Sequence, residues 1–253
     1  MSRADALFQI LNGLGPRVEQ QLFFILDFQI SYKTDICTVP VEICIKPTLL
    51  NGTINIECFQ TIINQPIPIQ HFLNSKHYTD FEHGISQENN PVPQTDFDFL
   101  WKKINSFIKS NMSKYSDSSM LPIVICTPFI SSVQCIEFLA SQAKVSDVRR
   151  SVFNTMFSVD DFVECVNRFK EIIPNTNAIY NFYKPLVCWT CNNNFKCDFH
   201  KSNGTRTFCC SKTNSEYLAS TLCDLYKTIK SKIFVASVPP QVQSMVPQQQ
   251  LYY

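Results

Sequence analysis

The stretch that decides the fold is LFFILDFQISYKTDICTVPVEICIK, residues 22–46, which holds two apolar runs joined by a short polar link. Residues 22–33 are apolar and aromatic, and residues 39–46 form a second run that ends at Pro47. Both runs have the length and the residue types of β-strands. Proline cannot donate to a strand ladder, so we expect the second strand to end there.

A third apolar run follows at residues 53–64, with isoleucine and cysteine alternating at its start. The link before it contains Asn51-Gly52, a dipeptide typical of hairpin turns. The region 22–64 therefore predicts three antiparallel strands in a meander.

Beyond the meander the pattern alternates between helix and strand. Residues 97–112 have apolar side chains at helical spacing, and residues 121–129 are wholly apolar, as in a buried parallel strand. Three further helices are predicted at residues 131–143, 158–173 and 215–233. Ser158 is the expected N-cap of the second of these. This order predicts a ribonuclease H-like α/β fold, related to DnaQ-type exonucleases, although other α/β folds share it.

Composition limits the function classes. The 253 residues include only 5 glycines, and neither G-x-G-x-x-G nor G-x-x-x-x-G-K-[ST] occurs, so a glycine-cradled phosphate site is not expected. The net charge is +1, so nucleic-acid binding would need a local patch. The sequence contains no run of about 18 apolar residues, so we expect no membrane span. The N-terminus does not resemble a signal peptide.

The chain divides into three parts by sequence. We expect an N-terminal extension at residues 1–20, one domain at residues 21–236 and a disordered Pro- and Gln-rich tail at residues 237–253. Without an export signal, the 12 cysteines are expected in a reducing compartment, where metal ligation explains a cysteine cluster better than disulfides do.

Such a cluster occupies residues 188–200, CWTCNNNFKCDFH, and Cys209 and Cys210 follow it. The C-x2-C and C-x2-H spacings are typical of zinc ligands. Two adjacent residues rarely both reach one metal ion, so we expect one of Cys209 and Cys210 to belong to the core. The alternative is that all of these cysteines are buried free thiols.

Two stretches resemble the Maelstrom domain. Residues 189–210, WTCNNNFKCDFHKSNGTRTFCC, resemble the family signature in which a Trp precedes a C-x2-H-x8-C element by eight residues. Residues 39–55, VPVEICIKPTLLNGTIN, resemble the family's P-x-E-[IL]-G block, although Cys44 stands where Gly is usual. The resemblance extends over roughly residues 21 to 240.

The resemblance implies an RNase H-like fold and one structural zinc ion. The implied ligand set is Glu42, Cys197, His200 and Cys209. A site with four protein ligands has no open position, so its role would be structural rather than catalytic. Cys188, Cys191 and Cys210 would then be core thiols. Many Maelstrom proteins carry an HMG box before this domain; no such box precedes it here, so DNA binding is not expected.

A two-metal exonuclease centre is not predicted. DEDD-type 3′–5′ exonucleases carry D-x-E on the first strand, whereas here Asp27 is followed by Gln29. No histidine is followed five residues later by aspartate. The segment HYTDFEH, residues 77–83, offers histidines and acids for metal-independent RNA cleavage, but a polar surface loop is the favoured interpretation.

Basic and aromatic side chains interleave near the cysteine–histidine element, a pattern that suits single-stranded RNA. The predicted RNA-binding residues are Lys196, Lys201, Arg206 and Lys212. Their aromatic neighbours would instead be core residues if the region simply packs around a metal ion.

The resemblance implies a single-stranded RNA-binding domain in piRNA-type RNA-mediated gene silencing in the germline, in meiosis, differentiation and development. The implied partners are single-stranded RNA and silencing-pathway proteins, with no membrane, and the implied locations are perinuclear cytoplasmic granules and the nucleus. One alternative is an active single-strand-specific endoribonuclease on the same fold. Another is a protein-interaction module without RNA binding.

Overall fold

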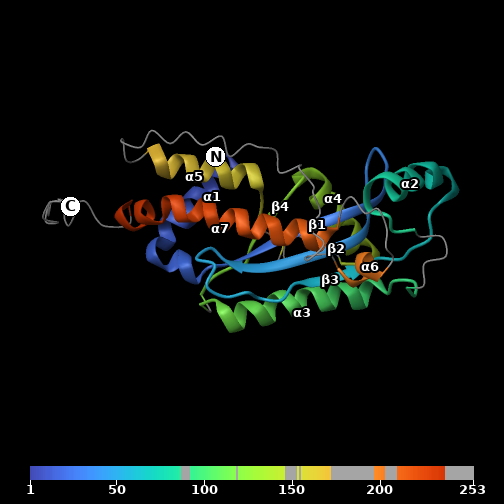
Figure 1. Cartoon of the computed structure of the whole chain (residues 1–253), viewed down its shortest axis with the longest axis horizontal. Helices are drawn as coiled ribbons and strands as arrows, with labels where there is room; N and C mark the ends of the chain where they lie inside the picture. Colours follow the sequence, from blue (N-terminus) through green and yellow to red (C-terminus); the bar gives the residue numbers. More distant parts are fainter. Residues whose placement is uncertain are drawn as a thin grey trace, which may run out of the picture.

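A five-stranded mixed sheet forms the centre of the molecule (Figure 1). The computed structural model describes residues 1–86, 92–117, 119–145, 153, 155–171, 197–202 and 210–236. The strand order is β3-β2-β1-β4-β5. The strands are β1 (Leu22–Lys33), β2 (Thr38–Leu49), β3 (Phe59–Ile62), β4 (Ile123–Cys126) and β5 (Met156–Ser158). β2 pairs antiparallel with both β1 and β3. β4 pairs parallel with β1, and β5 pairs parallel with β4.

The predicted meander is present, with two local differences. β2 does not end at Pro47 but continues to Leu49. β3 pairs with β2 only as far as Ile45. At Pro47 the edge of β2 that faces away from β1 therefore has no partner strand, and the missing N–H of proline costs no hydrogen bond there. The turn at Gly52 forms with φ +67°, but β3 starts only at Phe59, later than the predicted strand.

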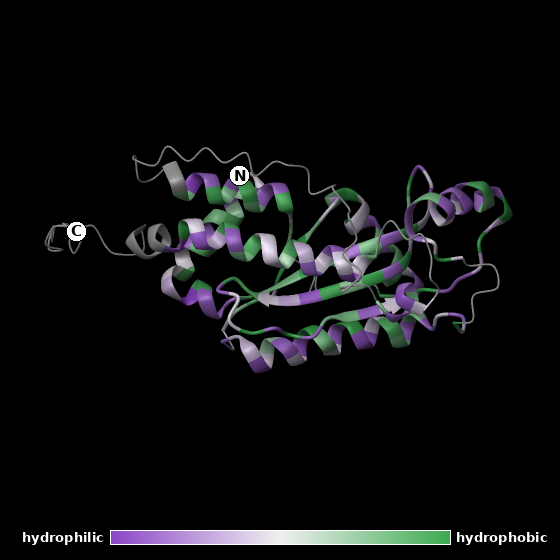
Figure 2. Ribbon diagram, viewed as in Figure 1, coloured by the Kyte–Doolittle hydropathy of each residue, from purple (hydrophilic) through white to green (hydrophobic). Residues whose placement is uncertain are grey.

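Helices cover both faces of the sheet, which makes three layers (Figure 1). On one face lie α1 (Arg3–Leu14), α5 (Val159–Glu171) and α7 (Ser211–Ala236), and on the other lie α3 (Phe97–Tyr115) and α4 (Phe129–Gln142). The alternation of β1 explains this: Phe23 and Ile25 point into the first layer, whereas Phe24 and Leu26 point into the second. Figure 2 shows the apolar side of α3 turned toward the sheet and its polar side turned outward.

The N-terminal residues form an ordered part of the first layer. The Ser2 hydroxyl accepts from the Asp5 amide at the start of α1, and Leu7 and Leu11 are fully buried in the core. Arg3 forms an ion pair with Asp161 on α5, with Nε and Oδ2 3.0 Å apart. A 3₁₀ turn, η1 (Gly15–Gln20), then leads into β1. The predicted tail, residues 237–253, lies outside the described residues.

A separate helical segment stands at one end of the sheet. It comprises η2 (Ile69–His71), α2 (Phe72–Tyr78) and the π-helical turn η3 (Thr79–His83). It contacts the end of β1, where the Tyr32 and His71 rings stack 4.8 Å apart. None of the helices in the described part of the chain is both long enough and apolar enough to cross a membrane.

Candidate metal centre

The face of the sheet beneath α7 carries polar side chains. Glu42 and Cys44 on β2 stand directly opposite Gln29 and Asp27 on β1, so all four share this face. Most of the sheet face toward α1 and α5 is apolar instead. The first turns of α7 therefore cover polar groups, and each of these groups needs a partner.

Glu42 is completely buried and fixed by two donors. Gln60 on β3 donates from Nε2 to Glu42 Oε1 at 2.8 Å. The backbone N–H of Ser211, at the start of α7, donates to Oε2 at 2.9 Å. The positive end of a helix favours a carboxylate in this position.

Cys197 and His200 come from one short helical turn, α6 (Asp198–Ser202). The Lys201 amide donates to the Cys197 carbonyl at 3.0 Å, which closes the turn. A three-residue spacing brings both side chains to the same side of a helix. Cys197 Sγ and His200 Nδ1 are accordingly 2.9 Å apart, and both residues are 2 % exposed or less.

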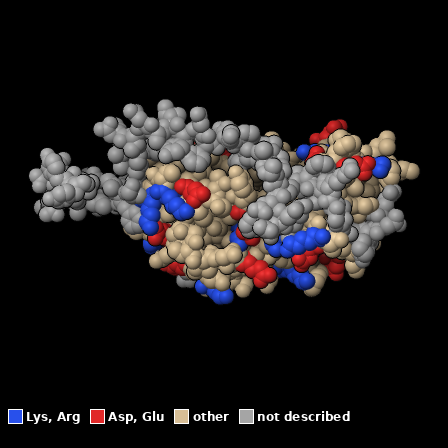
Figure 3. All heavy atoms as spheres, viewed as in Figure 1, with Lys and Arg blue, Asp and Glu red and all other residues tan. Residues whose placement is uncertain are grey.

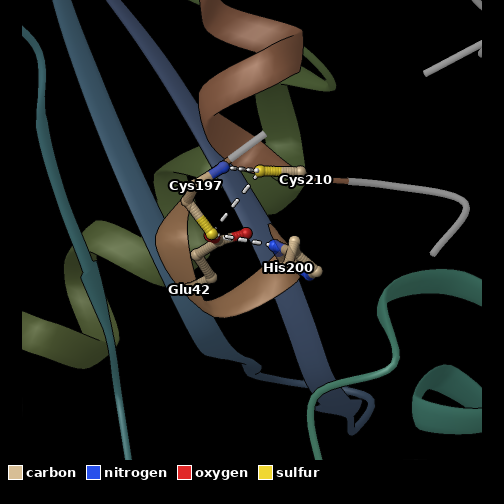
Figure 4. A group of neighbouring side chains, drawn as sticks. All are labelled: Glu42, Cys197, His200 and Cys210. Atoms are coloured by element: carbon tan, nitrogen blue, oxygen red, sulfur yellow. Dashed lines mark hydrogen bonds and ion pairs between the residues drawn. The ribbon is translucent and has the colours of Figure 1, made fainter. Parts of the chain in front are cut away.

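The fourth side chain, Cys210, immediately precedes α7. The Asn214 amide donates to the Cys210 carbonyl at 3.0 Å, so Cys210 occupies the N-cap position of that helix. Its thiol accepts from the Cys197 amide at 3.4 Å and lies 4.0 Å from Glu42 Oε1. Figure 4 shows the four side chains pointing toward one another from β2, α6 and α7.

These residues form a set that could hold a metal ion. One ligand atom from each of Glu42, Cys197, His200 and Cys210 lies within 4.8 Å of all the others, and all four residues are buried. Two sulfurs, an imidazole and a carboxylate are suitable ligands for a tetrahedral metal ion. Among the described residues no Lys or Arg pairs with Glu42, and His200, with Nδ1 3.8 Å from Oε1, is the one side chain there that could carry a positive charge. A metal ion bound by the group would supply positive charge at the buried carboxylate.

The protonation of the group fits the same conclusion. Burial raises the pKa of Glu42 to about 7, and charge on Cys210 adds to this effect. Hydrogen bonding from the Cys197 thiol lowers the pKa of Cys210 to about 3 although burial opposes it, and His200 contributes to the lowering. The same hydrogen bond raises the pKa of Cys197, with burial as the next cause. The pKa values of the two cysteines thus move in opposite directions, which favours one thiolate in the group, the form of cysteine that binds a metal ion.

A neighbouring carbonyl orients the histidine. His200 Nε2 lies 2.9 Å from the carbonyl oxygen of His83, which can only accept, so Nε2 carries the proton. Nδ1 is then free to bind a metal ion, and it points to Cys197 and Glu42. Such a carbonyl partner is a common support for metal-binding histidines.

Three of the four residues in the predicted ligand set, Glu42, Cys197 and His200, meet in this group. The fourth predicted ligand, Cys209, lies outside the described residues, as do Cys188 and Cys191. The cysteine that the structure adds is Cys210, which we had assigned to the core. The local pattern could not distinguish Cys209 from Cys210, because the two residues are adjacent. What separates them is the position of the first residue of α7, Ser211, which makes Cys210 the N-cap.

The segment at residues 77–83 does not converge into an acid–base pair. His83 is buried; its Nε2 donates to the Ile30 carbonyl at 3.0 Å and its Nδ1 accepts from the Ile85 amide at 2.9 Å. Burial lowers the pKa of His83 to about 4, so it stays neutral. His77 is exposed and its ring lies 5.0 Å from that of Phe81. The favoured interpretation, a polar surface loop, is wrong in form: residues 77–83 form the end of α2 and the turn η3, and His83 is buried.

Asp27 is also buried, with 5 % of its surface exposed. Its Oδ2 accepts from Asn214 on α7 at 3.1 Å and from Gln29 at 3.3 Å. Burial raises the pKa of Asp27 well above its ordinary value. Among the described residues, Asp27 belongs to no group of three or more metal-ligating side chains.

Two of the four predicted RNA-binding residues are placed by the structure. Lys201 follows His200 on α6, and its side chain is half exposed, 3.8 Å from Asp198. Lys212 is partly buried in the first turn of α7. Lys196 and Arg206 lie outside the described residues. In Figure 3 the visible Lys and Arg side chains are interspersed with Asp and Glu, so the described part of this face carries no broad basic surface.

Comparisons with known proteins agree with this architecture. A family model described as "Maelstrom: piRNA pathway germ-plasm component" matches residues 31–250. A search of curated proteins gave no match.

Among solved structures, two 3′-exonucleases share the fold. One, from a study of 3′-end specific recognition of a histone mRNA stem-loop, is 12% identical with a TM-score of 0.53, and the alignment covers 83% of this chain and 65% of that one. The other, a full-length 3′-exonuclease, is 12% identical with a TM-score of 0.50 over 83% and 62% of the two chains. The chain thus spans somewhat less than two thirds of these proteins. The nuclease domain of a DEDDh-family 3′-exonuclease bound to rAMP aligns over 82% and 92%, with 13% identity and a TM-score of 0.49. The predicted RNase H-like fold is confirmed.

Proposed function

The chain belongs to the Maelstrom family, and from this premise we propose that it is a single-stranded RNA-binding domain in piRNA-type gene silencing in the germline. The family model is described as a piRNA pathway component, and one fold neighbour recognises an mRNA stem-loop. The proposed partners are single-stranded RNA and silencing-pathway proteins, and the proposed locations are perinuclear granules and the nucleus.

The observation that carries the proposal is the place of two lysines beside the metal centre. Lys201 directly follows the ligand His200, and Lys212 lies two residues after Cys210. An ion bound by these ligands would fix the backbone that carries both cations. We propose zinc as that ion, because two sulfurs with an imidazole and a carboxylate match its preferences. Its role is structural, since all four ligands are buried.

The two-metal exonuclease centre is lost in this proposal. Two-metal chemistry needs several carboxylates around ions about 4 Å apart. Asp27 instead has an amide, Gln29, two residues later, and Asn214 of α7 donates to its carboxyl group. Both observations support a fold retained for binding rather than for exonucleolytic cleavage.

The test is binding of a labelled single-stranded RNA across a salt series, measured by fluorescence anisotropy. For single strands, the slope of log K against log salt changes by about 0.7 per phosphate contact. The double variant Lys201→Ala/Lys212→Ala should therefore reduce the slope by about 1.4 if both lysines bind phosphate. Lys227→Ala, which removes an exposed lysine paired with Asp224 on α7, is the matched control and should leave the slope unchanged.

Three other outcomes would change the assignment. RNA cleavage that persists in EDTA and survives repurification would favour the endoribonuclease. Absence of binding at every salt concentration would favour a protein-interaction module. Equal slopes for the double variant and the wild-type protein would remove these lysines from the RNA site.

A further inference from the structure

Two cysteines outside the metal centre lie together at the β3 edge of the sheet. Cys44 stands opposite Gln60, and the same register continued by one residue places Cys58 opposite Lys46. Cys44 and Cys58 are therefore diagonal neighbours on the face beneath α7. No strand lies between them, and each lies within reach of the other's charge.

A second pair of side chains shows how closely residues in this diagonal relation can approach. Glu42 and Gln60 have the same relation in the register as Cys44 and Cys58. Their side chains meet at 2.8 Å. Side chains with this diagonal relation can therefore meet, and Cys44 and Cys58 have the same relation.

The two thiols differ in access. Cys44 is fully buried, and Ser215 on α7 donates from Oγ to its sulfur at 3.0 Å. Cys58 is partly exposed. A small solute can therefore reach Cys58 first, with Cys44 held behind it.

A fixed cation stands beside the exposed thiol. The Lys46 ammonium is bound by Asn55 Oδ1 at 2.7 Å, by the Ile56 carbonyl at 2.7 Å and by Glu216 at 2.9 Å. The pKa of Cys58 is lowered, with the neighbouring Cys44 thiol as the main cause. Burial opposes this effect. The charge of Lys212 favours the thiolate, whereas the charge of Glu216 opposes it more than the charge of Lys46 favours it. Thiolates react with electrophiles and oxidants, whereas thiols do not.

Cys37 provides an internal contrast. It is also partly exposed, but burial and the negative charge of Glu137 raise its pKa. Two cysteines of similar access thus have opposite electrostatic surroundings. Their reactivities should differ for that reason alone.

We propose that Cys44 and Cys58 form an oxidation-sensitive dithiol site, at which a hydroperoxide converts the two thiols into a disulfide. The Cys58 sulfur attacks one peroxide oxygen, the O–O bond breaks, and hydroxide leaves and takes up a proton. Cys58 is then a sulfenic acid. The Cys44 sulfur attacks Cys58 Sγ, loses its proton and displaces the sulfenic oxygen as water. Two thiols and one hydrogen peroxide thus give one disulfide and two waters.

The backbone allows the bond to close. A disulfide needs the two Cβ atoms about 3.8 Å apart, closer than an ideal diagonal pair. Cys58 precedes the first residue of β3, in an irregular segment, so no ladder hydrogen bonds hold it. Only Cys58 has to move, while Cys44 stays in β2.

The experiment uses the zinc-loaded full chain at pH 7 in two steps. In the first, a limiting amount of iodoacetamide is added and the labelled sites are quantified by mass spectrometry. Cys58 should be alkylated several-fold faster than Cys37, because the pKa of Cys58 is lowered and that of Cys37 is raised. Equal rates would overturn the proposal.

In the second step the chain is treated with hydrogen peroxide, blocked with N-ethylmaleimide and digested without reduction. A glutamate-specific protease separates the two cysteines, because it cleaves after Glu42 and Glu57. A peptide linking Cys44 to Cys58 is expected, and it should disappear in Cys58→Ser and persist in Cys37→Ser. In Cys44→Ser, dimedone should trap the sulfenic acid at Cys58.

Two results would overturn the inference. One is a peroxide-dependent disulfide that joins Cys197 to Cys210 while Cys44 and Cys58 remain unlinked, which would place the reactive pair in the metal centre. The other is trapping of sulfenic acid at Cys58 in the wild-type chain without any linked peptide, because Cys44 would then not resolve it.

Discussion

Replacement of Cys210 by alanine is the sharpest test of the metal centre. Structural zinc sites contribute about 12 kcal/mol of apparent binding free energy through four ligands, or about 3 kcal/mol for each. Cys210 is fully buried, so water cannot take the place of its sulfur. Loss of about 3 kcal/mol corresponds to an affinity about 150-fold weaker. We expect Cys210→Ala to lose most of its zinc against a competing chelator.

The assay is a competition titration with a chromophoric zinc chelator, with metal content checked by elemental analysis. Cys223→Ala is the matched control: it lies on the same helix, is 8% exposed and contacts the Leu49 carbonyl rather than the metal ligands. Its zinc affinity should remain that of the wild-type chain. Cys209→Ala tests the assignment implied by the family resemblance. The argument from the structure fails if Cys210→Ala keeps wild-type affinity while Cys209→Ala loses it.

Three further predictions test the surroundings of the site and the fold. Gln60→Leu removes the donor that orients Glu42 and should weaken zinc affinity about 10- to 100-fold, measured in the same titration; unchanged affinity would mean that Gln60 does not support the ligand. Lys46→Met leaves the Glu216 carboxylate without its buried partner and should lower the free energy of unfolding in urea by about 2–3 kcal/mol; a loss well below 1 kcal/mol would contradict the contacts of Lys46. Asp161→Asn should cost about 1 kcal/mol at pH 7, because Asp161 and the Ser158 at the start of α5 cap each other.

The stability loss caused by Asp161→Asn should depend on pH, in a direction that follows from the pKa of Asp161. Burial raises the pKa of Asp161, but hydrogen bonds from Ser158 and Arg3 outweigh it, so the pKa lies below its ordinary value. A lowered carboxyl pKa gives stability that is present above the pKa of the unfolded chain and lost as the pH falls through the folded pKa. The difference between wild-type and Asp161→Asn chains should therefore be full at pH 6 and be lost as the pH falls through the lowered pKa of Asp161. A pH-independent difference would point to packing rather than charge.

The sequence predicted those elements whose signal is local. The bounds of β1 match the predicted run of residues 22–33, because most of its residues are apolar or aromatic, as in a strand buried on both faces. Ser158 was recognised as an N-cap, and its hydroxyl indeed accepts from Asp161. The start of α1 carries a local signal as well, since Ser2 and Asp5 form a capping box. A serine followed three residues later by an acid is typical of a helix start.

Contacts between distant segments were harder to foresee. The pairing of Glu42 with Cys197 and His200 came from family resemblance, because nothing in the local pattern connects residues about 150 positions apart. Cys210 was missed because its role depends on where α7 begins. The hydrogen bond from His200 Nε2 to the His83 carbonyl could not be predicted from residue types either, because every residue has a backbone carbonyl oxygen.

The start of α7 closes the face of the sheet on which the candidate metal centre lies. The polar groups of this face are not exposed, because the first turn of α7 lies over them: the Ser211 amide bonds Glu42, and Asn214 bonds Asp27. Cys210, at the N-cap of the same helix, joins the metal ligands. The position of α7 and the integrity of the metal centre are therefore linked. An ion bound by Cys210 would hold the helix over Asp27, and the helix end would favour the negative charge of Glu42. Because Ser215 on α7 also covers Cys44, the same helix shields the buried thiol of the dithiol site.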